Sequence, residues 1–182
     1  MNNNDILIKL RHALDIKNTD MVEIFKLGGI KLSEEDVQKM LMGSKEICSD
    51  GSDNKDETEE ITKCKNSTLE SFLNGFIIFK RGEQELKPGQ SEIAPLSIIS
   101  NKSINNIMLK KLKIALSLSS QDMLDIFEEA GDTITKDELS NLFRKEGHKH
   151  YKKCDDKHAI NFINGLAKDI IWCMKKLFNN KI

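Results

Sequence analysis

The stretch NNDILIKLRHAL at residues 3–14 returns as NNIMLKKLKIAL at residues 105–116, an offset of 102 positions. The match continues at the same offset, from DMVEIFKLGG at residues 20–29 to DMLDIFEEAG at residues 122–131. A pattern that recurs at a fixed offset shows which residues a fold unit needs, because those positions are kept in both copies. The sequence therefore predicts two repeats of one structural unit.

Apolar residues in both repeats recur at the three- and four-residue spacing of a helix that buries one face. The first helix of each repeat is expected to bury Ile6, Leu7, Leu10, Ala13 and Leu14, or Met108, Leu109, Leu112, Ala115 and Leu116. A second helix ends before Gly29 or Gly131, where a left-handed residue closes a helix at little steric cost. No segment shows the long alternation of a strand, so an all-α fold is predicted.

Polar residues mark the helix starts. The Asn-Asn pairs at 3–4 and 105–106 open the repeats, and Asn is a favoured N-cap because its side-chain oxygen accepts a bond from an unpaired backbone N–H. Ser33 and Thr135 are each followed three residues later by an acidic residue, the pattern of a capping box at a third helix.

The repeats go out of step after the third helix and resume at an offset of 90, with Cys64 and Gly75 matching Cys154 and Gly165. Repeat one carries an extra acidic stretch, 43–60, that is too polar to bury itself and is predicted to be a mobile loop. The matching glycines lie inside a fourth helix, where Gly costs about 1 kcal/mol against Ala. Their recurrence predicts a close helix–helix approach in each repeat.

These patterns predict two tandem homologous units of about four helices each, related by a pseudo-two-fold axis. The first repeat spans 1–80, a linker spans 81–104, and the second repeat spans 105–182 with an extended C-terminal helix. Each unit alone is near the size at which a hydrophobic core becomes marginal. The units are therefore expected to share an interface, which the apolar linker segment 93–99 and the tail around Trp172 would extend.

The composition is that of a soluble protein, with 38% hydrophobic and 31% charged residues and a net charge of −1. No apolar run is long enough to span a bilayer, and the first residues lack the pattern of a signal peptide. We therefore expect a cytoplasmic protein with no membrane contact. Residues 1–91 carry a charge of −4 and residues 92–182 carry +3, an asymmetry that can steer a partner without naming it.

A histidine- and cysteine-containing segment of repeat two is the best candidate for metal chemistry. Its zinc-binding residue types are His148, His150, Cys154 and His158. Their spacing matches no established zinc pattern, and Cys64, the counterpart of Cys154, has no histidine near it. The favoured interpretation is a buried structural cysteine, with no cofactor. Cysteine catalysis would also need a base and an oxyanion site that the sequence does not indicate, so we assign no catalytic residue.

The same segment is basic. Its candidate ligand or nucleic-acid contacts are Arg144, Lys145, His148, Lys149, Tyr151, Lys152 and Lys153. The second and third helices of repeat two resemble a helix-turn-helix. The third helix of repeat one carries Glu34, Glu35 and Asp36, which argues against tandem reading of DNA. A pair of packed helices with a solvated charged face is therefore preferred. A positive surface that joins this segment to Lys110, Lys111 and Lys113 would favour nucleic acid.

Two function classes follow. The first is a non-enzymatic interaction module that binds a protein or peptide in a groove between the repeats, or that self-associates. An exposed apolar patch lined by both repeats would support it. The alternative is a nucleic-acid-binding regulator that uses residues 144–153.

Several longer motifs resemble the YehS-like family of bacterial proteins of unknown function. They are the Asn3-Asn4 opening with 13–15, the segment 20–27, residues 79–82 with 88–90, and the segment 139–149 with Tyr151 and Cys154. The resemblance covers nearly the whole chain and implies a duplicated helical unit in a bacterial cytoplasmic protein. It brings no substrate, cofactor or catalytic residue. The chain departs from the family in its long acidic insertion, in His150 where Asn is expected, and in its extended tail 170–182.

Overall fold

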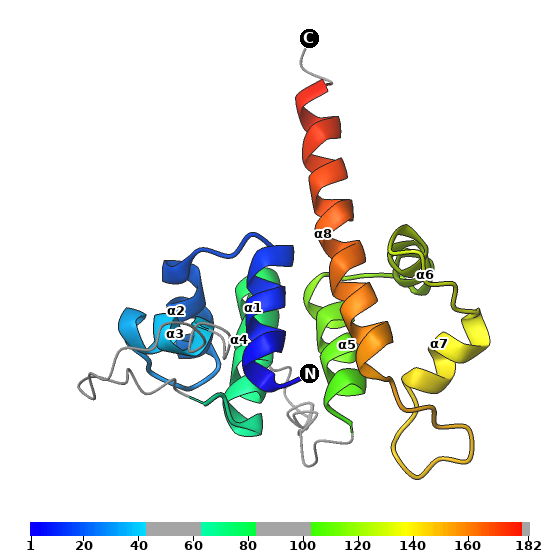
Figure 1. Cartoon of the computed structure of the whole chain (residues 1–182), viewed down its shortest axis with the longest axis horizontal. Coiled ribbons are helices and arrows are strands. Elements are labelled where there is room, and N and C mark those ends of the chain that lie inside the picture. The colour runs from blue at the N-terminus through cyan, green and yellow to red at the C-terminus, as the bar shows by residue number, and fades with distance from the viewer. Residues whose placement is uncertain (43–62, 83–102, 180–182) are drawn as a thin grey trace, which may run out of the picture.

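The computed structural model describes residues 1–42, 63–82 and 103–179, with the backbone alone for 169–179. Within these ranges every regular element is helical, which confirms the predicted all-α fold (Figure 1). The helices of repeat one are α1 (Asn3–Ala13), α2 (Asn18–Leu27), α3 (Glu34–Leu41) and α4 (Asn66–Arg81). Those of repeat two are α5 (Ile104–Ala115), α6 (Ser120–Glu129), α7 (Lys136–Leu142) and α8 (Asp156–Asn179).

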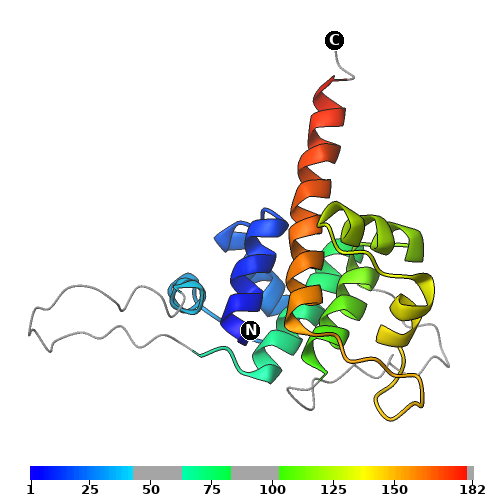
Figure 2. The same ribbon diagram turned by 45° about the vertical axis from the view of Figure 1, so that its right-hand side comes forward.

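Four helices form the centre of the molecule, and the others flank them. Helices α1, α4, α5 and α8 lie side by side, with α2 and α3 on one flank and α6 and α7 on the other (Figure 1). The repeats meet where α1 packs on α8 and where α4 packs on α5. Exchanging the repeats turns the first of these contacts into the second, as the predicted pseudo-two-fold relation requires. The backbone of α8 continues beyond this body, as Figure 2 also shows.

Equivalent phenylalanine pairs lie at the centre of each repeat. The rings of Phe25 and Phe72 lie 5.2 Å apart between α2 and α4, and those of Phe127 and Phe162 lie 5.0 Å apart between α6 and α8. Tilted rings at this separation interact favourably beyond the area they bury. All four residues are fully buried, so the periodic apolar faces read from the sequence are the ones that build the core.

Glycine permits the close crossing of the paired helices in both repeats. A Cβ atom on Gly75 would lie 1.8 Å from the carbonyl oxygen of Ile24, and one on Gly165 would lie 2.0 Å from that of Ile126. Backbone atoms at such distances cannot give way, so any larger residue would push the helices apart. The predicted close approach is confirmed in both repeats.

The third helices begin as the sequence predicts. Ser33 and Asp36 form a capping box at α3, and Thr135 and Glu138 form one at α7. In each box the hydroxyl accepts from the backbone N–H three residues on, and the acidic side chain accepts from the cap's own N–H.

The predicted role of the Asn-Asn pairs as caps is wrong. Helix α1 is capped by Asn2, whose side chain accepts from the N–H of Asp5 at 2.8 Å. Helix α5 has Ser103 at its N-cap, with no side-chain capping bond. The Asn pairs lie inside the first turns instead, where their side chains reach other segments of the chain.

A buried lysine lies between the repeats. The Lys111 side chain on α5 is only 2% exposed, and its ammonium donates to Asn74 Oδ1 on α4 at 2.7 Å and lies 3.8 Å from Glu70 Oε1. A buried charge needs such partners because burial otherwise disfavours it. Desolvation lowers the pKa of Lys111, while the charge of Glu70 acts in the opposite direction.

Some expectations concern residues that the structure does not describe. The acidic stretch 43–60 and most of the linker 81–104, including 93–99, lie outside the described residues. The tail around Trp172 belongs to α8, but its side chains are likewise not described.

Candidate binding groove between the two repeats

Two asparagines tie together the start of α1, the start of α4 and the end of α3. Asn4 donates through Nδ2 to the carbonyl oxygen of Met40 at 2.9 Å and accepts at Oδ1 from the N–H of Cys64 at 3.0 Å. Asn3 donates to the carbonyl oxygen of Cys64 at 3.1 Å and to Asn66 Oδ1 at 2.9 Å. A side-chain amide suits this task because it donates and accepts at once.

Repeat two builds the same arrangement. Asn106 donates to the carbonyl oxygen of Leu142 at 2.8 Å and accepts from the N–H of Cys154 at 2.9 Å. Asn105 donates to the carbonyl oxygen of Cys154 at 3.2 Å and to Asp156 Oδ1 at 2.9 Å. We call each set of bonds an asparagine clasp. The two clasps bring the N-termini of α1, α4, α5 and α8 to one end of the molecule.

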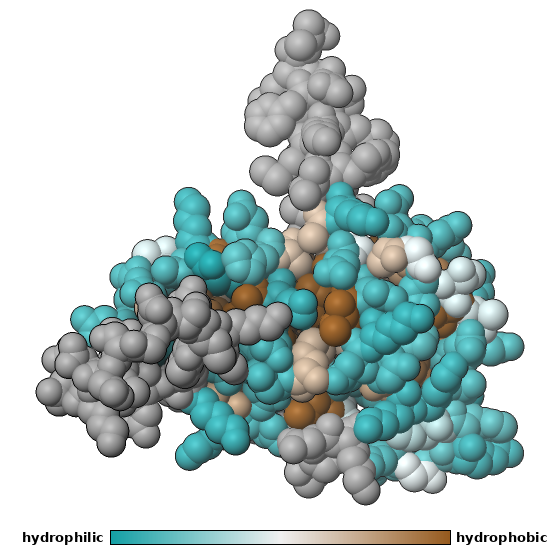
Figure 3. Space-filling view, viewed as in Figure 1, coloured by the Kyte–Doolittle hydropathy of each residue, from teal (hydrophilic) through white to brown (hydrophobic). Residues whose placement is uncertain are grey.

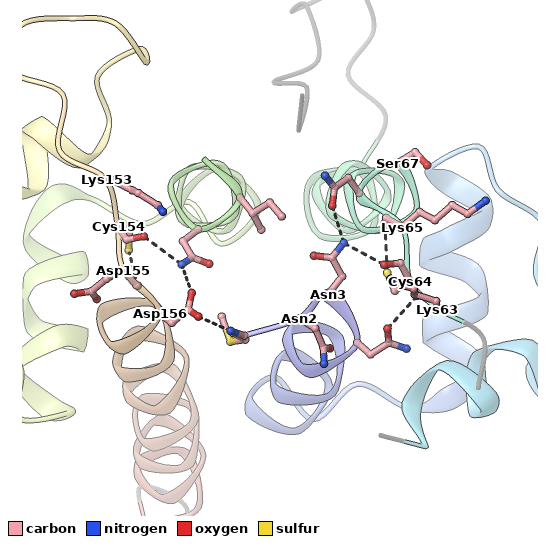
Figure 4. Close-up of a pocket in the computed structure, with 15 residues that line it drawn as sticks. Asn2, Asn3, Lys63, Cys64, Lys65, Ser67, Lys153, Cys154, Asp155 and Asp156 are labelled. Atoms are coloured by element: carbon pink, nitrogen blue, oxygen red, sulfur yellow. Dashed lines mark hydrogen bonds and ion pairs between the residues drawn. The ribbon is translucent and has the colours of Figure 1, made fainter. Parts of the chain in front are cut away.

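A groove of about 1270 Å³ opens between the clasps (Figure 4). Repeat one lines it with Met1, Asn2, Asn3, Asn4, Lys63, Cys64, Lys65, Asn66 and Ser67. Repeat two lines it with Ile104, Asn105, Lys153, Cys154, Asp155 and Asp156. Most of these residues occur as equivalent pairs, so the groove follows the pseudo-two-fold axis. Figure 4 shows the two sets on either side of the space between the repeats, with Lys153 directed toward that space and the side chains of Lys65 and Asp155 extending away from it.

The groove contains three exposed lysines, Lys63, Lys65 and Lys153. No ion pair with a residue in the described ranges engages Lys63 or Lys65, whereas the charge of Lys153 acts on the carboxylate of Asp156 and helps to lower its pKa. The starts of four helices add the positive end of the helix dipole at the same place. These positive charges suit the binding of an anionic group.

The two carboxylates of the groove already have partners. Asp155 accepts from the backbone N–H of His158 at 2.8 Å, which lowers the pKa of the carboxyl, and the His158 ring adds a second contact at 2.7 Å. Asp156 is bonded to the amino group of Met1 and to Asn105, and both bonds lower its pKa.

The cysteines of the groove are buried. Cys64 and Cys154 are 3% and 1% exposed, and burial raises the pKa of both thiols to about 12. Each thiol donates weakly to the carbonyl oxygen of the next residue. The thiolate is the nucleophile and the metal ligand, so these thiols are poorly suited to either role.

The structure separates the four metal candidates. His148 and His150 lie in the exposed turn after α7, where their rings are 5.8 Å apart. His158 lies on α8 between Asp155 and Asp132, and Cys154 is buried. Among the described residues, no group of three or more histidine, cysteine or acidic side chains is arranged to hold a metal ion.

The basic segment 144–153 is exposed, yet little of it faces the groove. Lys153 lines the groove, whereas Lys152 pairs with Glu138 at 2.8 Å and Tyr151 donates to Asn106 Oδ1 at 3.3 Å. Arg144, Lys145 and Lys149 are exposed, and Arg144 also contacts the side chains of Asn141 and His148. Lys111 cannot join them in the positive surface that would favour nucleic acid, because it is buried between the repeats.

An exposed apolar patch of large side chains is likewise not found among the residues that the structure describes. Hydrophilic residues cover both repeats in Figure 3, and hydrophobic ones show as a narrow strip between them. Among the described residues, Met42 is the large hydrophobic side chain classed as exposed, at 44%. Most residues that line the groove between the repeats are charged or polar, although apolar atoms also form a large part of its surface.

Sequence reasoning found Lys153 but missed Lys63 and Lys65. A signal was available, because KCKN at residues 63–66 and KCDD at 153–156 occupy equivalent places in the two repeats. The sequence pattern does not show that these two segments lie close together in the folded protein.

Helices able to cross a membrane are not found in the described part of the chain. A family described as "Protein of unknown function (DUF1456)" matches residues 3–82 and 105–170. The two matched stretches coincide with the two repeats.

A curated relative, the "Uncharacterized protein YehS" of Escherichia coli (strain K12), is 34% identical over 167 residues, which cover 92% of this chain and 95% of that protein. No solved structure matches the chain. The family match and this relative agree with the resemblance read from the sequence. The chain belongs to the DUF1456 family, whose function is unknown.

Proposed function

We propose that the protein is a non-enzymatic interaction module that binds a segment of a partner protein in the groove between its repeats. The observation that carries the proposal is the groove itself, which residues of both repeats line in equivalent pairs. A site that both repeats line can form only when the whole chain is folded. The two asparagine clasps support such a site because they hold the helix starts that form its walls.

The residues of the groove support binding better than chemistry. Its thiols are buried with a pKa of about 12, and its carboxylates are held by Met1, Asn105 and His158. Exposed lysines beside side-chain and backbone amides suit a peptide, which presents both charges and hydrogen-bonding groups.

The mixed charge of the groove favours a protein partner over nucleic acid. Asp155 and Asp156 line the same space as Lys153, and carboxylates there repel a continuous run of phosphates. The exposed residues Arg144, Lys145 and Lys149 keep nucleic acid as the alternative that an experiment must exclude.

A photo-crosslinking amino acid at Ser67 tests the proposal in the full-length protein. Ser67 is exposed in the first turn of α4 and lines the groove. Thr19 is the matched control, because it is exposed in the first turn of α2 and also lies two residues after a lysine at the N-cap. We expect nuclease-resistant adducts with a protein from Ser67 and not from Thr19.

Three results would contradict the proposal. Equal adducts from both positions would mean that the groove is not the site. No adduct from Ser67 in the native host would leave the groove without a protein partner. Adducts that disappear on nuclease treatment would favour the nucleic-acid alternative. A crosslink to a second copy of the chain would identify self-association as the interaction.

A further inference from the structure

The two ends of the groove carry different charges at equivalent positions. Lys63 and Lys153 match, but the next exposed position is Lys65 in repeat one and Asp155 in repeat two. The first helical residue is then Asn66 in α4 and Asp156 in α8. The pseudo-two-fold relation therefore holds for the backbone and fails for the charge.

The α8 end of the groove is supplied with carboxylates by the protein itself. Asp155 accepts from the N–H of His158 at the start of α8. Asp156 follows within the first turn and bonds Asn105 and Met1. Acidic groups at a helix N-terminus satisfy its free N–H groups and its dipole. The start of α8 therefore needs no additional negative charge from a ligand.

The α4 end is cationic. Lys65 occupies its N-cap without a side-chain capping bond, and its first turn contains no acidic residue. Lys63 adds a second exposed ammonium two residues earlier, on the same wall of the groove. Two lysines and a helix start without a side-chain cap thus line one end of a groove whose other end carries two carboxylates of its own.

We propose that the groove binds a peptide segment of its partner in one orientation, with acidic side chains of that segment against Lys63, Lys65 and the start of α4. This inference rests on the proposed function and adds the chemistry of the partner to it. Charge complementarity at the α4 end supplies the attraction, and Asp155 and Asp156 repel the acidic end of a segment bound in reverse. The same two carboxylates disfavour a polyanion that fills the whole groove.

The substitution Lys65→Glu separates binding from stability. It reverses the charge that would meet the acidic side chains, so binding falls. It also gives α4 an acidic N-cap, so helix content and thermal stability do not fall. Lys17→Glu is the matched control, since Lys17 is an exposed N-cap without a side-chain capping bond on α2, with backbone angles close to those of Lys65.

The first probes are three labelled pools of random peptides about ten residues long, which differ only in having Glu, Gln or Lys at the same fixed positions. The fourth probe is a labelled single-stranded oligonucleotide. Fluorescence anisotropy at low salt measures the apparent affinity of the full-length protein for each. We expect the Glu pool to bind about tenfold more tightly than the Gln pool, and Lys65→Glu to weaken it at least about fivefold. Lys17→Glu should change it less than about twofold, because that site lies outside the groove.

Equal affinity for the Glu and Gln pools would overturn this inference and leave the proposed function intact, provided that Ser67 still crosslinks to a protein. An unchanged affinity of Lys65→Glu for the Glu pool would also overturn it, because the acidic peptides would then bind elsewhere. Tighter binding of the oligonucleotide than of the Glu pool would replace the acidic peptide by nucleic acid. Failure of every probe together with failure of the crosslink would remove both proposals.

Discussion

The two repeats are alike inside and unlike at the groove. Each contains an asparagine clasp, a buried cysteine, a tilted phenylalanine pair and a glycine at the helix crossing. At the groove they differ in charge, with Lys65 opposite Asp155. A second difference lies at the interface, where Lys111 is buried whereas its equivalent Lys9 is half-buried. The shared features hold the unit together, so the differences are where a specific function is to be sought.

The largest expected effect concerns the reactivity of the two equivalent free cysteines, Cys64 and Cys154. Burial raises the pKa of Cys64 and Cys154 from 9.0 to about 12, so the thiolate fraction near pH 8 falls about a thousandfold. Both should resist alkylation in the native protein and react readily in denaturant, as time-resolved mass mapping of each cysteine-containing peptide would show. Rapid labelling of native Cys154 alone would break the equivalence and reopen a catalytic role for it.

The helix crossings come next. Gly75→Ala and Gly165→Ala should each lower the free energy of unfolding by about 3 kcal/mol or more, because the added Cβ meets a backbone carbonyl in both repeats. Chemical denaturation of the two variants measures this. The control is Asn164→Ala, an exposed change beside Gly165 that should cost less than about 0.5 kcal/mol. A mild effect in one repeat only would mean that the crossings are not equivalent.

The asparagine clasps should show a smaller loss. Asn4→Ala and Asn106→Ala each leave the buried N–H of a cysteine and a carbonyl oxygen of the third helix without those bonds. We expect a loss of about 2 kcal/mol for each variant by denaturant titration. Asn2→Ala, which removes only a helix cap, should cost about 1 kcal/mol and serves as the comparison. Clasp variants no worse than this control would show that the clasps do not hold the groove.

The smallest effect is expected at the interface lysine. Near neutral pH, Lys111→Met should lie within about 1 kcal/mol of the wild type, because lost desolvation offsets the lost bonds to Asn74 and Glu70.

The pH dependence of this variant has a definite sign. The pKa of Lys111 in the folded protein is lower than the ordinary value of 10.5, so above the folded pKa the unfolded chain binds more protons. The wild type should therefore gain stability relative to Lys111→Met as pH rises toward that ordinary value. Lys9→Met is the control, and an equal trend in that variant would contradict the assignment to the buried site.

Much of the fold could be read from local sequence because its determinants are local. Helical spacing identified the buried faces, and the capping boxes at Ser33 and Thr135 involve atoms three residues apart. Gly29 and Gly131 have φ values of +87° and +77°, as expected of residues that close a helix. The recurrence of Gly75 and Gly165 was enough to predict a close helix–helix approach, because a glycine occurs at the same place in both repeats.

The failures share one cause. The Asn pairs were predicted to cap their own helices, but their amides bond segments 36 to 63 residues away. The local pattern also did not show that Lys111, one of three nearby lysines, is buried against Glu70 and Asn74 of the other repeat. Nothing in the local pattern distinguishes a side chain that bonds its own turn from one that bonds a distant segment.

The sequence by itself determined the helices, their buried faces and the duplication, because each follows from spacing along one segment or from its recurrence. Only the tertiary structure decided that four helix N-termini meet, that a groove opens between them, and that Lys63 and Lys65 of repeat one line the same groove as Lys153, Asp155 and Asp156 of repeat two. The physical reason is that the groove forms only where the two repeats pack against each other across the pseudo-two-fold axis. The sequence of a single segment carries no information about that packing.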